Sequence, residues 1–225
     1  MGARLFYAFF APFASHFAFL HFFYRLEHMV TIVQKDDPIL RKIAKPVTKS
    51  MFGTPALHQI IVDMKAAVDS QDDAVAIAAP QIGKSLRIFI VAGKVFDLLG
   101  QKEPNLDETV PGNVPAEAAP KEAEDLVFIN PEIVKLSRER KEMEEGCLSV
   151  RYLYGKTMRA KKAKVRAQDE QGRWFEIGGT GLLAQIFQHE TDHLAGELFI
   201  DKATEIEDLP PENDKPAGSK RKHVA

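Results

Sequence analysis

The sequence predicts an α+β fold in which short, mostly antiparallel strands pack around a central metal-binding HExxH helix. Residues 182–194 have apolar side chains at helical spacing and carry the pattern His-Glu-x-x-His. Short runs typical of strands precede this segment, and another amphipathic helix is expected before them. One helix, then strands, then the metal-binding helix is an order of elements typical of the α+β class.

The expected elements follow in chain order. A helix is predicted at residues 54–70, because Ile60, Ile61, Met64 and Val68 share one face. Strands are predicted at residues 86–92, 126–129, 163–168 and 174–177, and the second of these extends past Pro131 to residues 133–136. The run Asp169-Glu170-Gln171-Gly172 is a turn signal, so the last two strands are expected to form a hairpin.

The helix at residues 182–194 carries a metal-binding pattern. His189 and His193 are four residues apart, so they lie one turn apart on the same face and can reach one divalent ion. Glu190 follows the first histidine, where its carboxylate can act on a metal-activated water as general base and then as general acid. Two ordinary helix histidines are the alternative interpretation of this pair.

A catalytic zinc-type site needs a third protein ligand and one open position. Phe199 stands where the extended metalloprotease motif has its third histidine, so that motif is incomplete. Cys147, the one cysteine of the chain, is a better candidate, since a thiolate is a strong ligand for a borderline metal. The alternative for Cys147 is a small buried hydrophobic residue.

Three segments, taken in order, resemble the three motifs of peptide deformylases. They are residues 74–83 (AVAIAAPQIG), 145–149 (EGCLS) and 188–193 (QHETDH). The resemblance runs from about Val30 to Asp201 and includes the Asn130-Pro131 pair. Three ordered motifs are far more specific than one histidine pair.

The resemblance implies removal of the formyl group from the N-terminal formyl-methionine of newly made polypeptides. It assigns Cys147, His189 and His193 as ligands of one divalent metal ion. That ion is Fe²⁺ by the resemblance, whereas this ligand set alone would suggest Zn²⁺. Glu190 is then the proton shuttle.

The resemblance also implies the remaining site residues. The side-chain amide of Gln81 and the backbone N–H of Leu148 stabilise the developing oxyanion. The expected substrate contacts are Ala76, Ile77, Gly146 and Glu145. The segment around Ala76 is expected to pair with the substrate as an added strand.

The chain departs from the motifs at several positions. Ala74 and Ala76 replace usual glycines, which hinders close approach of a peptide backbone. Arg151 stands where a proline is common, and Arg159 is a candidate for substrate contact, with a solvated strand-end charge as its alternative. Two other functions stay open: a catalytically weak or silent deformylase-like protein, and a metallopeptidase of other specificity.

Residues 29–208 are expected to form the catalytic domain, with additions on either side and within it. Residues 1–28 are aromatic and are interpreted as an untranslated reading-frame extension before Met29, a membrane-associated segment or an ordered extension. Residues 93–125 are an insertion whose centre is expected to be a mobile surface loop, with an active-site lid as the alternative. Residues 209–225 are expected to form a polar, disordered tail.

Composition constrains the partners and the compartment. A net charge of −2 gives no reason to expect DNA binding. One cysteine excludes an intrachain disulfide and fits a reducing compartment, so a bacterial-type cytoplasm is expected. The expected partner is the nascent formyl-methionyl polypeptide, with weak ribosome contact as a further possibility. Membrane contact is expected only if residues 1–28 are native.

Overall fold

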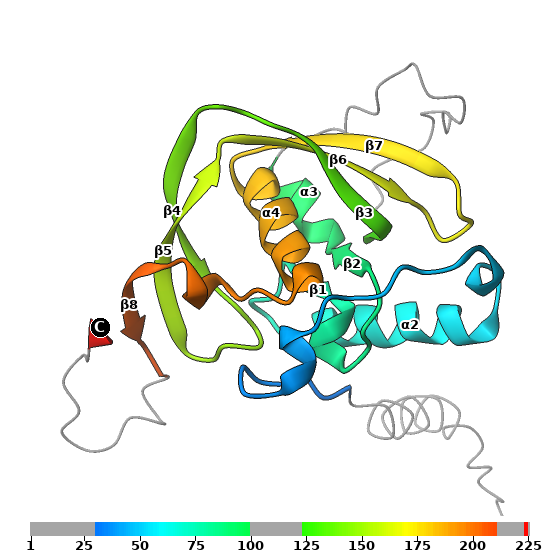
Figure 1. The fold of residues 1–225 in the computed structure, drawn as a ribbon, viewed down its shortest axis with the longest axis horizontal. Coiled ribbons are helices and arrows are strands. Elements are labelled where there is room, and N and C mark those ends of the chain that lie inside the picture. The colour runs from blue at the N-terminus through cyan, green and yellow to red at the C-terminus, as the bar shows by residue number, and fades with distance from the viewer. Residues whose placement is uncertain (1–29, 100–122, 211–222, 225) are drawn as a thin grey trace, which may run out of the picture.

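The computed structural model of the protein describes residues 30–99, 123–210 and 223–224 (Figure 1). The expectations for residues 1–28, for the centre of the insertion at 93–125 and for residues 211–222 lie outside the described residues.

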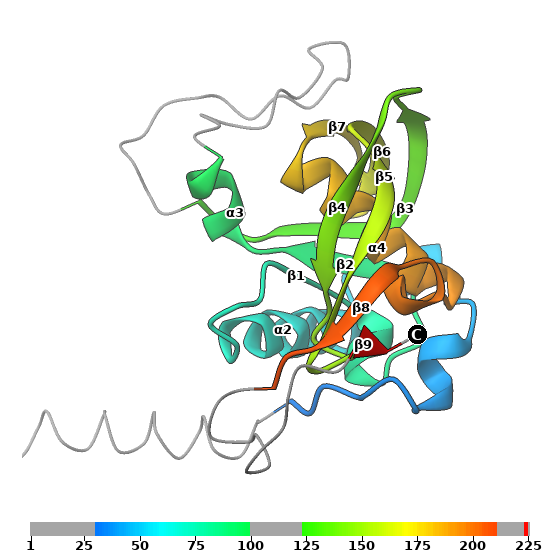
Figure 2. The same cartoon turned by 90° about the vertical axis from the view of Figure 1, so that its left-hand side faces the viewer.

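The described strands form two antiparallel sheets. The first has the order β1 (Ala76–Ala78), β2 (Ile88–Val91), β3 (Leu126–Leu136), β6 (Lys162–Gln168) and β7 (Trp174–Thr180). The second has the order β4 (Arg140–Gly146), β5 (Leu153–Ala160), β8 (Thr204–Asp208) and β9 (His223–Val224), as Figure 2 shows. One edge of β1 and one edge of β4 therefore have no neighbouring strand among the described residues.

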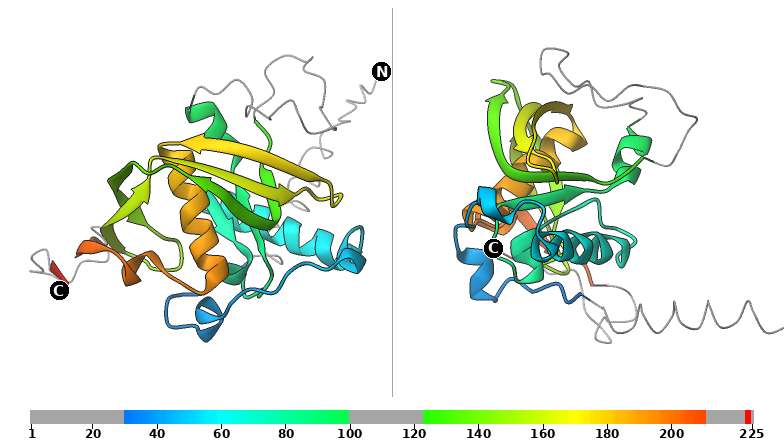
Figure 3. Two further views of the ribbon diagram at one scale, coloured as in Figure 1. Left: turned by 45° about the horizontal axis from the view of Figure 1, so that its top comes forward. Right: turned by 90° about the vertical axis from the view of Figure 1, so that its right-hand side faces the viewer.

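Two helices cover opposite faces of the first sheet. On β2, Phe89 and Val91 pack towards α4 (Leu182–Ala195), whereas Ile88 and Ile90 pack towards α2 (Pro55–Asp69). Both faces are covered, so this strand is apolar at every position and does not alternate. α4 also contacts β5 of the second sheet, and Figure 3 shows it running between the two sheets. The central position predicted for this helix is confirmed.

Both ends of α4 are set by glycine. Gly181 precedes the helix with φ 55°, and Gly196 follows it with φ 80°. A Cβ at Gly196 would also lie 2.8 Å from the Arg41 carbonyl oxygen. The left-handed backbone and the close contact both require glycine there, so the helix ends at Ala195, two residues after His193.

The helix predicted at residues 54–70 is α2. The Thr54 side chain accepts a hydrogen bond from the Leu57 N–H at 3.3 Å, and Pro55 occupies the first helical position. Ile61, Met64 and Val68 are buried against the first sheet. The described residues also form short 3₁₀ helices: η1 (Pro38–Arg41), η2 (Lys49–Met51), η3 (Ala79–Ile82) and η4 (Phe199–Asp201).

The structure describes short elements at the start of the insertion and near the end of the tail. The insertion begins with a short helix, α3 (Gly93–Leu98), because Val95 and Phe96 are apolar and pack into the core. In the tail, His223 and Val224 pair with β8, whose edge is open to an added strand. None of the helices in the described ranges combines the length and apolar character needed to cross a bilayer.

Candidate metal centre and active site

The fold brings one thiol and two imidazoles together. Cys147 follows β4 directly, and His189 and His193 lie on α4. Their ligand atoms all lie within 4.8 Å of one another, and Cys147 Sγ is 3.3 Å from His193 Nε2. The helical spacing explains the two histidines, whereas Cys147 arrives from the other sheet because β4 ends beside α4.

These residues fit a divalent metal ion. Within the described residues, Glu190 Oε2 is buried without a hydrogen-bond partner, and Glu190 borders the same cavity as Cys147 and His189. Buried polar atoms are normally satisfied, so an unpartnered oxygen beside three potential ligands indicates a missing partner. Burial lowers the pKa of His193 well below its usual value, whereas for His189 burial is outweighed by the hydrogen bonds to Cys147 and Glu145, which raise the pKa. A cation bound between the rings would favour the neutral, ligating form of both. A thiolate and two imidazoles suit zinc and other first-row divalent ions.

Glu190 lies beside this cluster but is not part of it. The residue is 4 % exposed, and burial raises the pKa of its carboxyl to about 7. A carboxyl that gains and loses a proton near neutral pH is suited to general acid–base catalysis.

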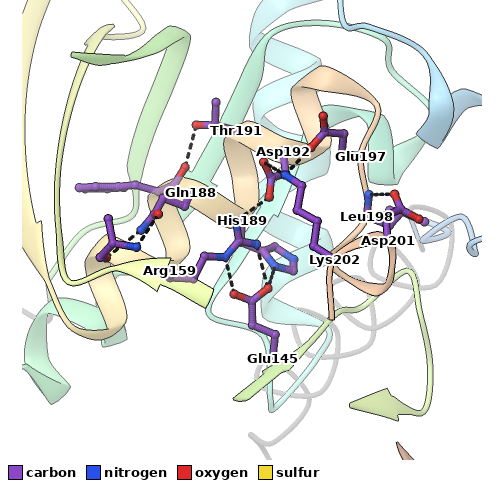
Figure 4. A network of polar contacts seen from close by, with 12 residues as sticks. Glu145, Arg159, Gln188, His189, Thr191, Asp192, Glu197, Leu198, Asp201 and Lys202 are labelled. Carbon is purple, nitrogen blue, oxygen red and sulfur yellow. Dashed lines mark hydrogen bonds and ion pairs between the residues drawn. The ribbon is translucent and has the colours of Figure 1, made fainter. Parts of the chain in front are cut away.

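A buried ion-pair network orients one of the histidines (Figure 4). Glu145 Oε2 lies 3.1 Å from His189 Nδ1, which leaves Nε2 of that ring for the metal side. Arg159 donates to both oxygens of Glu145, at 2.7 and 2.9 Å, and to Asp192 Oδ2 at 2.6 Å. Burial alone would raise the pKa of Glu145, but the hydrogen bonds from Arg159 and His189 outweigh it and hold that pKa at about 2.

Gln188 fixes α4 against the second sheet. Its Oε1 accepts from the Ala160 N–H at 2.9 Å, and its Nε2 donates to the Ala160 carbonyl at 3.0 Å and to Ala184 O at 2.8 Å. The side chain therefore satisfies both backbone groups of Ala160 at the end of β5.

Gln81 points its amide at the cluster. Its Oε1 accepts from the Ala78 N–H at 2.8 Å, and its Nε2 donates to Ser149 Oγ at 3.2 Å and to Cys147 Sγ at 3.5 Å. The orientation of the amide is therefore fixed, with the N–H groups on the metal side. Leu148 follows Cys147 directly and borders, together with Gln81 and Cys147, the cavity described next.

A cavity of about 300 Å³ opens beside these groups. Ala74 and Ala76 border it from the β1 side, Glu145 and Gly146 from the β4 side, and Glu190 from α4. The cavity thus lies between the two strand edges that have no neighbouring strand among the described residues. An extended peptide placed there is able to hydrogen-bond to either edge.

Comparisons with known proteins agree with this geometry. The family model described as polypeptide deformylase matches residues 29–208. The chain belongs to this family. A peptide deformylase from Acidobacterium capsulatum is 37 % identical over 169 residues, which cover 75 % of this chain and 83 % of that protein. One from Carboxydothermus hydrogenoformans is 36 % identical over 175 residues, which cover 78 % and 93 %.

Solved deformylase structures share the fold. The actinonin-bound class I type b enzyme from Acinetobacter baumannii has a TM-score of 0.62 at 32 % identity, covering 78 % of this chain and 98 % of that one. The Legionella pneumophila enzyme has a TM-score of 0.59 at 39 % identity, covering 77 % and 85 %. This deformylase is therefore a metal-dependent hydrolase that removes the formyl group from N-terminal formyl-methionine and releases formate. The comparisons favour that activity over a silent relative or another metallopeptidase.

The side chains of Ile77 and Glu145, two of the expected substrate contacts, do not project freely into the cavity. The Ile77 side chain is fully buried on the α2 face of β1, opposite the cavity, because neighbouring strand residues point to opposite faces. The Glu145 side chain is 2 % exposed and both its oxygens are paired, with Arg159 and His189, so the carboxylate holds His189 in place.

Arg159 is neither a substrate contact nor a solvated strand-end charge. Its side chain is 5 % exposed and lies between the carboxylates of Glu145 and Asp192. Sequence analysis missed the role of Asp192, although its place between the two metal-binding histidines was a signal that a cation would be near. Lys202, which pairs with Asp192 at 3.0 Å, extends this network to the surface.

Arg159→Met is expected to lower the free energy of unfolding by about 3–5 kcal/mol, because the Glu145 carboxylate stays buried without its cation. Urea unfolding followed by circular dichroism measures the change. Arg173→Met is the matched control, since the Arg173 side chain is 69 % exposed in its pair with Asp169. The control substitution is expected to lower the free energy of unfolding by less than about 1 kcal/mol. Equal costs for the two variants would contradict a structural role for the buried network.

Proposed function

We propose that this deformylase holds the formyl-methionyl end of a nascent polypeptide in the cavity between β1 and β4. Cys147, His189 and His193 would ligate one divalent ion, Fe²⁺ in the family's manner, with Zn²⁺ as the alternative that the ligand set favours. The observation that carries the proposal is the approach of these ligand atoms to within 4.8 Å, beside an unpartnered oxygen of Glu190.

A divalent ion bound by these ligands supplies Lewis acidity, which polarises the formyl carbonyl and favours deprotonation of a water. Glu190 accepts the water proton at its buried carboxylate and later donates it to the leaving amine. Its pKa of about 7 suits both transfers. Glu145 holds the ring of His189 through Nδ1 during the cycle.

Gln81 and Leu148 are proposed to stabilise the oxyanion that develops on the formyl oxygen. The Ala78 N–H holds the Gln81 amide oxygen, so Nε2 stays on the Cys147 side, where one N–H would exchange its 3.5 Å contact with Cys147 Sγ for the oxyanion. The backbone N–H of Leu148 is the second donor. Donors fixed before the reaction stabilise developing charge better than water does, because water must reorganise.

Ala76 and Gly146 are proposed as backbone contacts of the peptide, one on each strand edge. Gly146 cannot be replaced without movement, because a Cβ there would lie 2.7 Å from the Tyr154 ring. The Tyr154 ring therefore packs directly on the backbone that borders the cavity.

Ala76→Gly is expected to raise kcat/KM for formylated peptides two- to tenfold, about 0.4–1.4 kcal/mol, because removal of the methyl admits the peptide backbone more closely. Glycine is also expected to cost the fold roughly 0.5–1 kcal/mol. Steady-state kinetics and thermal melts measure the two effects. Ala163→Gly on β6, buried but away from the cavity, should reproduce only the loss of stability. A decrease in kcat/KM for Ala76→Gly would mean that its methyl is part of the site's packing.

The direct test of this function uses formyl-Met-Ala-Ser and its unformylated counterpart with the full chain. Formate release from the first peptide and no hydrolysis of the second are expected. Metal analysis of protein prepared anaerobically with Fe²⁺ or Zn²⁺ should give one ion per chain. Cleavage of a peptide bond in either substrate would instead support a peptidase.

The cytoplasm is the proposed location, because formyl-methionyl chains are produced there by the ribosome. The basic run at residues 220–223 motivates the proposal of weak ribosome contact.

A further inference from the structure

Arg151 joins the two walls of the substrate cavity. It lies on the wall that follows Cys147, and its guanidinium reaches Asp73 on the wall that leads into β1. Arg151 donates to Asp73 Oδ2 at 2.6 Å, to Asp73 Oδ1 at 3.2 Å and to Gln71 Oε1 at 2.8 Å. A bidentate contact of this kind fixes the orientation of the guanidinium in addition to pairing the two charges. We call Arg151 and Asp73 the cleft pair.

The cleft pair lies at the end of the β1 edge that is remote from the metal ligands. The edge runs from Asp73 through Ala76 to η3, where Gln81 contacts Cys147. Given the proposed function, a peptide with its formyl group at Cys147 extends along this edge away from Gln81. The residues that follow its methionine therefore approach the cleft pair.

The charges of the cleft pair offset each other in the intact protein. Asp73 and Arg151 have side chains that are 57 % and 25 % exposed, so both remain accessible to a peptide. Removal of either partner therefore leaves the charge of the other uncompensated at this end of the cavity.

We propose that Arg151 and Asp73 are specificity-determining residues that set the charge preference for the peptide residues following formyl-methionine. Arg151 attracts acidic side chains that Asp73 alone would repel, and Asp73 limits this attraction by occupying the guanidinium. Loss of Asp73 frees Arg151 for an acidic peptide, whereas loss of Arg151 leaves the Asp73 carboxylate without its cation. The two substitutions must therefore shift the preference in opposite directions.

The test uses C-terminally amidated peptides, so that the only variable charge is on one side chain. The kcat/KM of the metal-loaded full chain is measured for formyl-Met-Ala-Ala, formyl-Met-Ala-Asp and formyl-Met-Ala-Lys, and for the same charges placed directly after methionine. Asp73→Asn is expected to raise the acidic-to-basic ratio of kcat/KM about three- to tenfold, and Arg151→Gln is expected to lower it by a similar factor. Both shifts should shrink at 0.5 M salt.

Glu170→Gln is the matched control. It also removes one carboxylate from a partly exposed ion pair, with Lys65 at 3.1 Å, but Glu170 does not border the cavity. For this variant, the ratio of kcat/KM for the acidic peptide to kcat/KM for the basic peptide is expected to equal that of the unsubstituted enzyme. Each ratio compares two peptides on one protein sample, so a variant that folds incompletely still gives a valid ratio.

Opposite shifts in the two variants at either peptide position would support the proposal. Ratios that change less than twofold at both positions, or shifts of the same sign, would overturn it. The neutral peptide separates this result from the proposed function: no hydrolysis of formyl-Met-Ala-Ala by the unsubstituted enzyme would overturn the function itself.

Discussion

Glu190→Ala is expected to lower kcat by two to four orders of magnitude while leaving the metal bound. Glu190 is the proposed carrier of the proton, and general acid–base groups typically contribute on the order of 10²- to 10⁴-fold to a rate. The residue is adjacent to a metal-ligating histidine but supplies no ligand atom to the cluster. Metal content and steady-state turnover, measured on the same sample, separate the two effects.

Glu197→Gln is a suitable control for this variant. Glu197 follows α4 and is paired with Lys202 at the surface, so turnover is expected to remain close to that of the unsubstituted enzyme. Near-normal turnover of Glu190→Ala would remove Glu190 from the mechanism. Loss of the metal together with turnover would show that the carboxylate supports the ligands instead.

Cys147→Ala is expected to abolish stable metal binding, and with it the activity. The substitution removes the sole thiolate and leaves two imidazoles, and metal affinity depends steeply on the number of deprotonated ligands. Metal analysis after dialysis measures the loss directly. Met158→Ala, which removes an exposed sulfur-containing side chain from β5, should keep its full metal content. Full occupancy in Cys147→Ala would refute the three-ligand assignment.

The helix α4 and the place of its two histidines on one face were predictable because their signals are local. The histidine spacing and the apolar face of α4 are both contained in residues 182–194. β4 was not predicted as a strand, since six of its seven residues are not buried and its one buried side chain is Glu145. β4 is a strand because its backbone pairs with β5 in an antiparallel hairpin, and not because its side chains form an apolar face.

The network around Arg159 was not predictable, because it depends on register. Glu145 and Arg159 lie 14 residues apart on different strands, and Asp192 is a further 33 residues along. No periodicity in the sequence indicates that these three side chains converge. The face that the Ile77 side chain takes was not predictable for a related reason: β1 is buried on both faces, so its sequence does not tell which face borders the cavity.

The described ends of the insertion at residues 93–125 meet each other. The Gly93 N–H donates to Asp125 Oδ1 at 2.9 Å, and a Cβ on Gly93 would lie 1.5 Å from the Ala123 carbonyl oxygen. The chain therefore leaves and re-enters the domain at one point, between the paired strands β2 and β3. Closing a longer segment at such a point costs only about 0.6 kcal/mol for each doubling of its length. In evolutionary terms, this connection is a place where the gene can gain or lose codons without disturbing the metal ligands.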